Sequence, residues 1–175
     1  MKFIETKLKG AFVIEIEPLV DQRGFFARTY CLNEFKKHGL IEPVNQYNKS
    51  YSAQKGTIRG LHYQREPHQE SKLVQVFSGS IFDVIIDARE GSPTYCQWFG
   101  VELTAQNNTM LYCPKGFAHG FQTLEDQTLV FYHSSAAYNP ESEKGIRFND
   151  PKFHIQWPVD VTSVSDKDQN CDDFQ

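Results

Sequence analysis

The stretch Lys72-Leu-Val-Gln-Val-Phe-Ser-Gly-Ser-Ile-Phe-Asp-Val-Ile-Ile-Asp87 contains two runs of β-branched and aromatic residues, separated by Ser78-Gly-Ser80. Runs of this composition favour β-strands, and a Gly-centred turn between them predicts a β-hairpin, Lys72 to Phe77 paired with Ile81 to Asp87. Asp83 lies inside the second run, where a carboxylate is costly unless it is paired. We therefore expect a cationic neighbour for Asp83.

Short apolar runs with turn residues between them continue on both sides of this stretch, which is typical of an all-β sandwich or barrel. About ten strands are expected, together with a few short helices. Besides the hairpin, the pattern predicts strands at 11–17, 25–30, 97–103, 109–113, 120–123 and 129–134, and a helical turn at 33–39. The predicted fold is a double-sheet jelly roll, a single domain over 1–175. Inward polar side chains should line a cavity between its sheets; the candidates are His62, Lys72, Asp83, His119 and Tyr132.

Composition excludes several classes of function. The chain has 175 residues and a formal net charge of −4, and its Lys and Arg residues are scattered, so no nucleic-acid-binding surface is expected. Neither a signal peptide nor an apolar run long enough to span a membrane is evident, so we expect no membrane association and a cytoplasmic location. The four cysteines, Cys31, Cys96, Cys113 and Cys171, lack a C-x-x-C spacing and are expected to be free thiols.

A metal-binding β-barrel of the cupin type carries His-x-His, then a Glu that six residues separate from a Gly, and later Pro-x-Gly-x-x-His. Here His62 is followed by Gln64, Lys72 occupies the Glu position, and Pro114 to His119 returns one His. Two imidazoles and an ammonium do not make a metal shell, because a ligand must offer a lone pair. The pattern favours proton chemistry without a metal or cofactor, with a His base and a Lys that stabilises an oxyanion.

A series of ordered motifs points to one family. The motifs are Asp21-Gln-Arg-Gly-Phe25, Gln46-Tyr-Asn-Lys-Ser50, Arg59-Gly-Leu-His-Tyr-Gln64, Lys72-Leu-Val74, Gly91-Ser-Pro-Thr94, Pro114-Lys-Gly-Phe-Ala-His-Gly-Phe121, Asn149-Asp-Pro151, Trp157-Pro158 and Ser165-Asp-Lys-Asp168. In these the chain resembles the dTDP-4-dehydrorhamnose 3,5-epimerases along nearly its whole length. The resemblance implies a metal-independent jelly-roll homodimer that exchanges its N-terminal strand. It also implies inversion of C3 and C5 beside the C4 ketone of a nucleotide-diphosphate 6-deoxy sugar, a step of deoxysugar biosynthesis.

The same resemblance assigns roles to individual residues. His62 would be the base, Asp168 would pair with its other ring nitrogen, Tyr132 would deliver a proton from the opposite face, and Lys72 would hold the enolate oxygen. Because Asp168 lies in an acidic C-terminal segment, residues 165–168 should be ordered. The residues matched to nucleotide contacts are Arg23, Gln46, Asn48, Arg59, His119, Tyr138, Glu143 and Lys167, with Tyr138 stacking on the base and Arg23 serving the neighbouring subunit.

One position departs from the family pattern. The family's Arg-Gly-Phe-Phe-x-Glu run ends here in Arg28, so a carboxylate acceptor that contributes to nucleotide contacts is replaced by a permanent donor. This leaves three readings open: a CDP- or GDP-linked 4-keto sugar as substrate, an added phosphate contact, or an Arg28 that points to solvent.

Other functions stay open at the level of sequence. They are a C3-only or C5-only epimerase, a jelly roll that binds a nucleotide sugar without turnover, and a metal-dependent cupin enzyme. The remaining histidines have no comparable setting and are expected to be surface or structural residues: His38, His68, His133 and His154.

Overall fold

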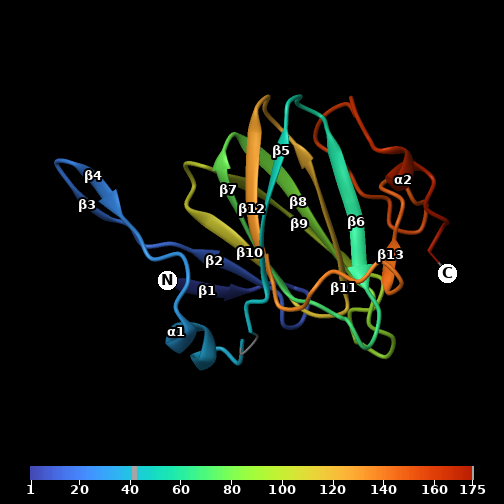
Figure 1. Ribbon diagram of the computed structural model, residues 1–175, viewed down its shortest axis with the longest axis horizontal. Coiled ribbons are helices and arrows are strands. Elements are labelled where there is room, and N and C mark those ends of the chain that lie inside the picture. The colour runs from blue at the N-terminus through green and yellow to red at the C-terminus, as the bar shows by residue number, and fades with distance from the viewer. Residues whose placement is uncertain (41–42, 175) are drawn as a thin grey trace.

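The computed structural model describes residues 1–40 and 43–174, and in these ranges the protein is almost entirely β-structure (Figure 1). Its strands form two large antiparallel sheets and one small ribbon, which confirms the all-β prediction. The helices of the described ranges are short, α1 (Leu32–Lys37) and α2 (Asp166–Gln169). None of them is long and apolar enough to cross a membrane.

The two large sheets supply the walls of the jelly roll. The six-stranded sheet runs, in spatial order, β1 (Lys2–Glu5), β2 (Phe12–Glu15), β10 (Thr109–Cys113), β7 (Lys72–Ser78), β12 (Thr128–Ser134) and β5 (Gln46–Ser52). The five-stranded sheet runs β13 (Glu143–Gly145), β6 (Ile58–Gln64), β11 (Phe117–Thr123), β8 (Ser80–Asp87) and β9 (Trp98–Thr104). The ribbon consists of β3 (Leu19–Asp21) and β4 (Gly24–Phe26).

The hairpin predicted for residues 72–87 is wrong, although both of its strands exist. β7 pairs with β10 and β12, whereas β8 pairs with β11 and β9, so the chain passes from one sheet to the other at Gly79. Gly79 has φ +75°, and a Cβ there would collide with Thr128. The glycine therefore makes a corner between sheets. A glycine-centred turn specifies a change of direction, but it does not specify which strands pair.

Most other strand predictions are confirmed with shifted ends. The expected strands at 11–17, 97–103, 109–113, 120–123 and 129–134 correspond to β2, β9, β10, β11 and β12, and the helical turn at 33–39 is α1. Only the start of the expected strand at 25–30 is extended, as the end of β4. Thirteen strands occur in the described ranges, more than expected. The strands that were not predicted are β5, which is polar, β6, in which a glycine and polar residues interrupt the apolar pattern, and the short β1, β3 and β13.

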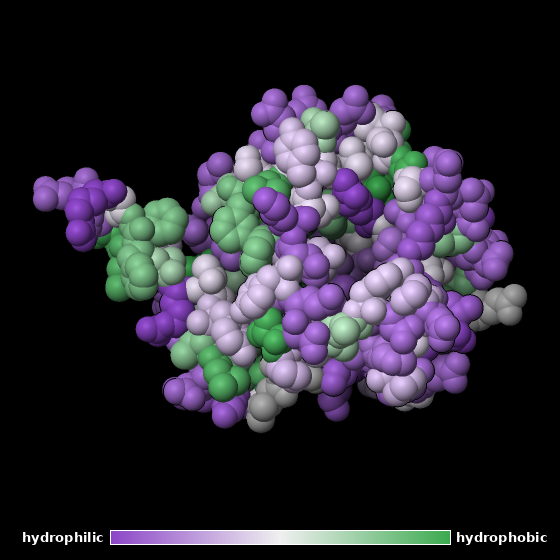
Figure 2. Space-filling model, viewed as in Figure 1, coloured by the Kyte–Doolittle hydropathy of each residue, from purple (hydrophilic) through white to green (hydrophobic). Residues whose placement is uncertain are grey.

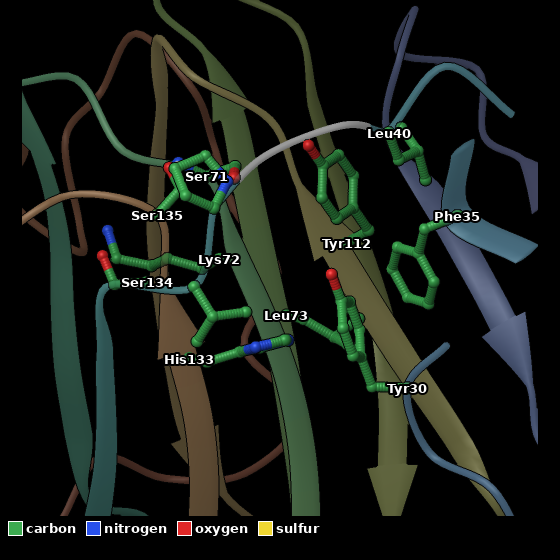
Figure 3. A pocket seen from close by; sticks show the side chains of 12 residues that line it. Tyr30, Phe35, Leu40, Ser71, Lys72, Leu73, Tyr112, His133, Ser134 and Ser135 are labelled. Carbon is green, nitrogen blue, oxygen red and sulfur yellow. The ribbon is translucent and has the colours of Figure 1, made fainter. Parts of the chain in front are cut away.

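Alternation along the strands separates a core between the sheets from a second cluster outside them. Val74 and Val76 of β7 meet Ile81 and Ile85 of β8 in the inner core. Leu73, which precedes Val74, points outward, where it packs beside Phe35 of α1. Figure 3 shows this outer cluster and the Lys72 side chain directed away from it. Lys72 therefore shares the inward face with the two valines.

The β3–β4 ribbon extends away from the body of the molecule (Figure 1). Its large apolar side chains are exposed, at 72% for Leu19, 78% for Val20, 64% for Phe25 and 69% for Phe26. In the space-filling view these residues form an apolar patch on the projection (Figure 2). Exposure of this extent on a projecting ribbon is typical of a surface that another chain covers.

Candidate active site

A cavity of about 510 Å³ opens between the sheets and brings together side chains from distant parts of the sequence. The five-stranded sheet supplies one wall and the six-stranded sheet the other, while the segment before and within α2 closes one side. The predicted site residues that line it are Arg59, His62, Lys72, His119, Tyr132, Lys167 and Asp168. The expectation of a polar cavity between the sheets is therefore confirmed.

His62 and Asp168 form a hydrogen-bonded pair in this cavity. The Nε2 atom of His62 lies 2.7 Å from Oδ1 of Asp168, and among the described residues no partner is recorded for Nδ1 of the same ring. Burial raises the pKa of the Asp168 carboxyl, but the hydrogen bond and charge of His62 and the backbone N–H of Gly60 outweigh it. The pKa of Asp168 is therefore below its ordinary value. Asp168 is a carboxylate at neutral pH, suited to orient the ring and stabilise its protonated form.

Asp168 reaches the cavity because α2 folds back onto β6. Ser165 caps the helix, its Oγ accepting a hydrogen bond of 3.1 Å from the Asp168 N–H. Oδ2 of Asp168 accepts a second bond from the Gly60 N–H at 3.1 Å, so both carboxylate oxygens are held. The prediction that residues 165–168 are ordered is confirmed.

His119 lies opposite His62 and has its own carboxylate. The two histidines are register partners across β11 and β6, and Nε2 of His119 lies 2.7 Å from Oδ1 of the fully buried Asp83. The expected partner of Asp83 is therefore His119. Gly60 allows the close approach of the two strands, since a Cβ at that position would lie 2.7 Å from the backbone oxygen of His119.

Lys72 and Tyr132 face His62 from the six-stranded sheet. They line the cavity of about 510 Å³ and also a neighbouring cavity of about 370 Å³, so the two cavities meet at these side chains. The second cavity contains the predicted residues Gln46, Asn48 and Tyr138. A long ligand can therefore extend from the His62–Asp168 pair past Lys72 and Tyr132.

A second polar network lies at the rim. The Tyr138 hydroxyl donates a hydrogen bond of 2.7 Å to Oε2 of Glu143, which also forms an ion pair of 2.6 Å with Lys167. Burial raises the pKa of Glu143, but the hydrogen bonds from Lys167 and Tyr138 outweigh it, so the net shift is downward. The carboxylate in turn raises the pKa of Lys167. Tyr138, Glu143 and Lys167 are thus joined, as their assignment to one binding region requires.

Arg59 is a fixed cation at the cavity wall. Its Nε donates to Ser52 Oγ at 3.0 Å and its Nη2 donates to the Tyr51 carbonyl at 2.8 Å. These bonds orient a planar guanidinium, which suits it to bind phosphate oxygens.

Arg23 and Arg28 do not lie at either cavity. Arg23 is at the exposed tip of the β3–β4 ribbon and pairs with Asp21, with 2.5 Å between Nη2 and Oδ2. Arg28 is also exposed and lies 3.2 Å from Glu34 of α1. Within one chain, the structure does not bring these two predicted residues to the rest of the site.

Sequence reasoning missed several residues that line the cavities. The most informative are Gln64 and Glu70, which are buried beside Lys72. Gln64 ends the motif of residues 59–64 but was given no role, and Glu70 belongs to no motif. The other missed lining residues are Ser50, Thr57, Ile58, Phe121, Ser134, Ser163, Val164 and Ser165. None of His38, His68, His133 and His154 lines either of these two cavities. In residues 1–40 and 43–174, no three His, Cys, Asp or Glu side chains are grouped so that they could hold a metal ion.

Comparison with known proteins gives a consistent result. The sequence model of the dTDP-4-dehydrorhamnose 3,5-epimerases matches residues 5–175. The protein of that name from Methanothermobacter thermautotrophicus is 43% identical over 172 residues, which cover 97% of this chain and 92% of the relative.

Solved structures agree in fold. The dTDP-4-dehydrorhamnose 3,5-epimerase of Bacillus anthracis, determined with TDP and PPi bound, superposes with a TM-score of 0.96 at 43% identity, covering 99% of both chains. The dTDP-6-deoxy-D-glucose-3,5-epimerase of Legionella pneumophila, in complex with dTDP-4-keto-L-rhamnose, has a TM-score of 0.91 at 39% identity, covering 97% of this chain and 90% of that one.

Proposed function

Since the chain belongs to the dTDP-4-dehydrorhamnose 3,5-epimerase family, we propose that it inverts C3 and C5 of a dTDP-linked 4-keto-6-deoxyhexose. One observation carries the assignment to the cavity: the His62–Asp168 pair on one wall faces Tyr132 and Lys72 on the other. Inversion needs a base on one face of the sugar and a proton donor on the opposite face, and the two sheets supply them separately.

Each inversion begins with removal of a proton from a carbon beside the ketone. Nδ1 of His62 takes the proton, the C–H electron pair forms a double bond between that carbon and C4, and the π electrons of the C4 carbonyl move onto its oxygen, which becomes the enolate oxygen. Asp168 stabilises the imidazolium that forms, and the Lys72 ammonium stabilises the enolate oxygen. The Tyr132 hydroxyl then donates a proton to the other face of the carbon, the electron pair returns from the oxygen, and the ketone re-forms.

In this proposal the diphosphate lies in the first cavity, where Arg59 and His119 contact it. The nucleoside extends into the second cavity, where Gln46, Asn48 and Tyr138 contact it. A thymidine nucleotide is favoured over CDP and GDP, because the similar enzymes of B. anthracis and L. pneumophila were solved with TDP and with a dTDP-sugar.

We also propose that a second copy of this chain covers the β3–β4 ribbon. The ribbon cannot bury Leu19, Val20, Phe25 and Phe26 against its own body, so an exchanged position on a partner subunit would remove them from water. Such a homodimer would carry Arg23 to the partner's cavity. Light scattering after size-exclusion chromatography should give twice the chain mass, and Phe25→Ser with Phe26→Ser should shift it to the monomer. A wild-type monomer would contradict this proposal.

The cytoplasm is the compartment proposed for the reaction. All four cysteines are free thiols, as the sequence predicts, and such thiols persist where the medium is reducing.

The decisive experiment measures deuterium from heavy water entering dTDP-4-keto-6-deoxyglucose, with NMR locating the label at C3 and C5. We expect both positions to be labelled by the wild type and neither by His62→Asn. Label at C3 alone or at C5 alone would show that the protein inverts only that one carbon. No label with the dTDP, CDP or GDP sugar would refute the epimerase function.

A further inference from the structure

Among the described residues, the counter-ion of Lys72 is Glu70. The Lys72 ammonium lies 2.6 Å from Oε1 of Glu70, and the Lys72 side chain is only 13% exposed. No other hydrogen-bond acceptor for Nζ is recorded in the described residues. One N–H of the ammonium is therefore directed at Glu70, and the other two remain for groups in the cavity.

The Glu70 carboxylate is itself fixed. It is buried, and its Oε2 accepts a hydrogen bond of 2.5 Å from the Gln64 side-chain amide. Gln64 is held in turn, because its amide nitrogen donates to the His68 carbonyl at 2.8 Å and its amide oxygen accepts from the Asn139 N–H at 2.5 Å. A carboxylate with both oxygens engaged cannot turn without breaking a buried hydrogen bond, so it restricts where the ammonium can lie.

The anchor of this network stands on the strand that carries the base. His62 and Gln64 are two residues apart in β6, so their side chains leave the strand on the same face. Lys72 comes from β7 in the other sheet. The chain of contacts from Gln64 through Glu70 to Lys72 therefore ties the ammonium of one sheet to the strand of the base in the other.

We propose that Glu70 is a positioning residue that aims the Lys72 ammonium at the ketone oxygen while His62 attacks the neighbouring C–H. The inference rests on the proposed function, since it assumes that an enolate forms in this cavity. Glu70 also supplies the negative charge that a buried ammonium requires. Because the pair is neutral as a whole, it contributes little to holding the substrate's diphosphate, and its effect should fall on the chemical step.

The test is a double-mutant cycle in the deuterium assay. Glu70→Gln keeps the shape of the side chain and removes its charge, so kcat should fall about 10- to 100-fold while KM for the dTDP-sugar stays within about twofold. Lys72→Met should lower kcat further, by about 10²- to 10³-fold. In the Lys72→Met background, Glu70→Gln should have almost no additional effect, because there is no ammonium left to position.

The matched control is Glu141→Gln, an exposed glutamate that should leave kcat and KM unchanged. Glu70→Asp retains the charge but withdraws it by one methylene, so it should keep the melting temperature and recover only part of kcat. If Glu70→Gln does not fold, Glu70→Asp decides the matter, and a wild-type kcat in that variant overturns the proposal. Equal losses from Glu70→Gln with and without Lys72 would also overturn it. Absence of label in the wild type would instead refute the proposed function, on which the inference depends.

Discussion

Replacing Asp168 by Asn tests the reasoning about the site most directly. The change removes a negative charge that lies 2.7 Å from Nε2 of His62, and it alters the side chain by a single atom. The amide oxygen can still accept a hydrogen bond from the Gly60 N–H or from His62, but it cannot stabilise an imidazolium as a carboxylate does. The substitution therefore destabilises the neutral form of the His62 ring less than the protonated form that arises during proton removal.

The expected loss follows from that difference. A hydrogen bond to a charged group contributes about 1.5–3 kcal/mol, and about 1.4 kcal/mol corresponds to a factor of ten in rate. kcat for labelling at C3 and C5 should therefore fall about 10- to 100-fold. KM should change little, because the contact strengthens only as the proton moves.

The assay compares initial rates of deuterium incorporation over a range of dTDP-sugar concentrations. Asp166→Asn is the matched control, because this exposed aspartate stands in the same short helix and should leave the rate unchanged. Thermal melting would show whether α2 stays docked. Full activity of a folded Asp168→Asn protein would refute the assignment of the pair. Equal losses of kcat in both variants would show that the effect comes from the total charge of α2 and not from the contact between Asp168 and His62.

Three further changes test other parts of the structure. Tyr132→Phe removes the proton donor but not the base, so label exchange should persist from the His62 face while inverted product falls about 10²-fold or more; retained inversion would exclude Tyr132 as the donor. Gly60→Ala places a Cβ 2.7 Å from the backbone oxygen of His119 and should cost about 1–3 kcal/mol in chemical denaturation, an unchanged midpoint being the contrary result. The buried Asp87 carboxylate is desolvated, but bonds from Arg89, Ser92 and Thr94 lower its pKa to about 2. Its stabilisation, about 2 kcal/mol, should be present above about pH 4 and lost as the pH falls towards 2, and Asp87→Asn should lack this acid-dependent component of unfolding free energy.

How much of the fold the sequence predicts depends on the range of the interaction involved. Strand propensity and alternation are local, so β7, β8, β10 and β12 are found close to their true ends. Pairing is not local, and the predicted hairpin fails for that reason. β7 and β8 each contribute an apolar face to the same core, and this is equally compatible with a hairpin and with strands in opposite sheets.

In the candidate site, too, local sequence patterns are predictable and contacts between distant residues are not. The spacing of His62, Lys72 and His119 is enough to argue against a metal shell and to favour proton chemistry. It does not bring in Asp168, which is 106 residues from His62 and became a candidate only through the family resemblance. Glu70 was missed for the opposite reason: it is close to Lys72 in sequence, but a glutamate in a polar turn gives no sign that it will be buried.

Arg28 lies outside the site that a single chain forms. Its replacement of the family's carboxylate suggests an altered nucleotide preference, yet within the chain it pairs with Glu34 and lies outside both cavities. Glu34 also binds the N-terminal ammonium at 3.1 Å, so Arg28 shares a carboxylate that already has a cationic partner. Arg28 is exposed and Glu34 is half-buried, so the pair is screened by solvent and contributes only about 0–1 kcal/mol. A phosphate from a second subunit's substrate would compete with Glu34 for Arg28. Any effect of Arg28 on the nucleotide therefore requires the proposed homodimer.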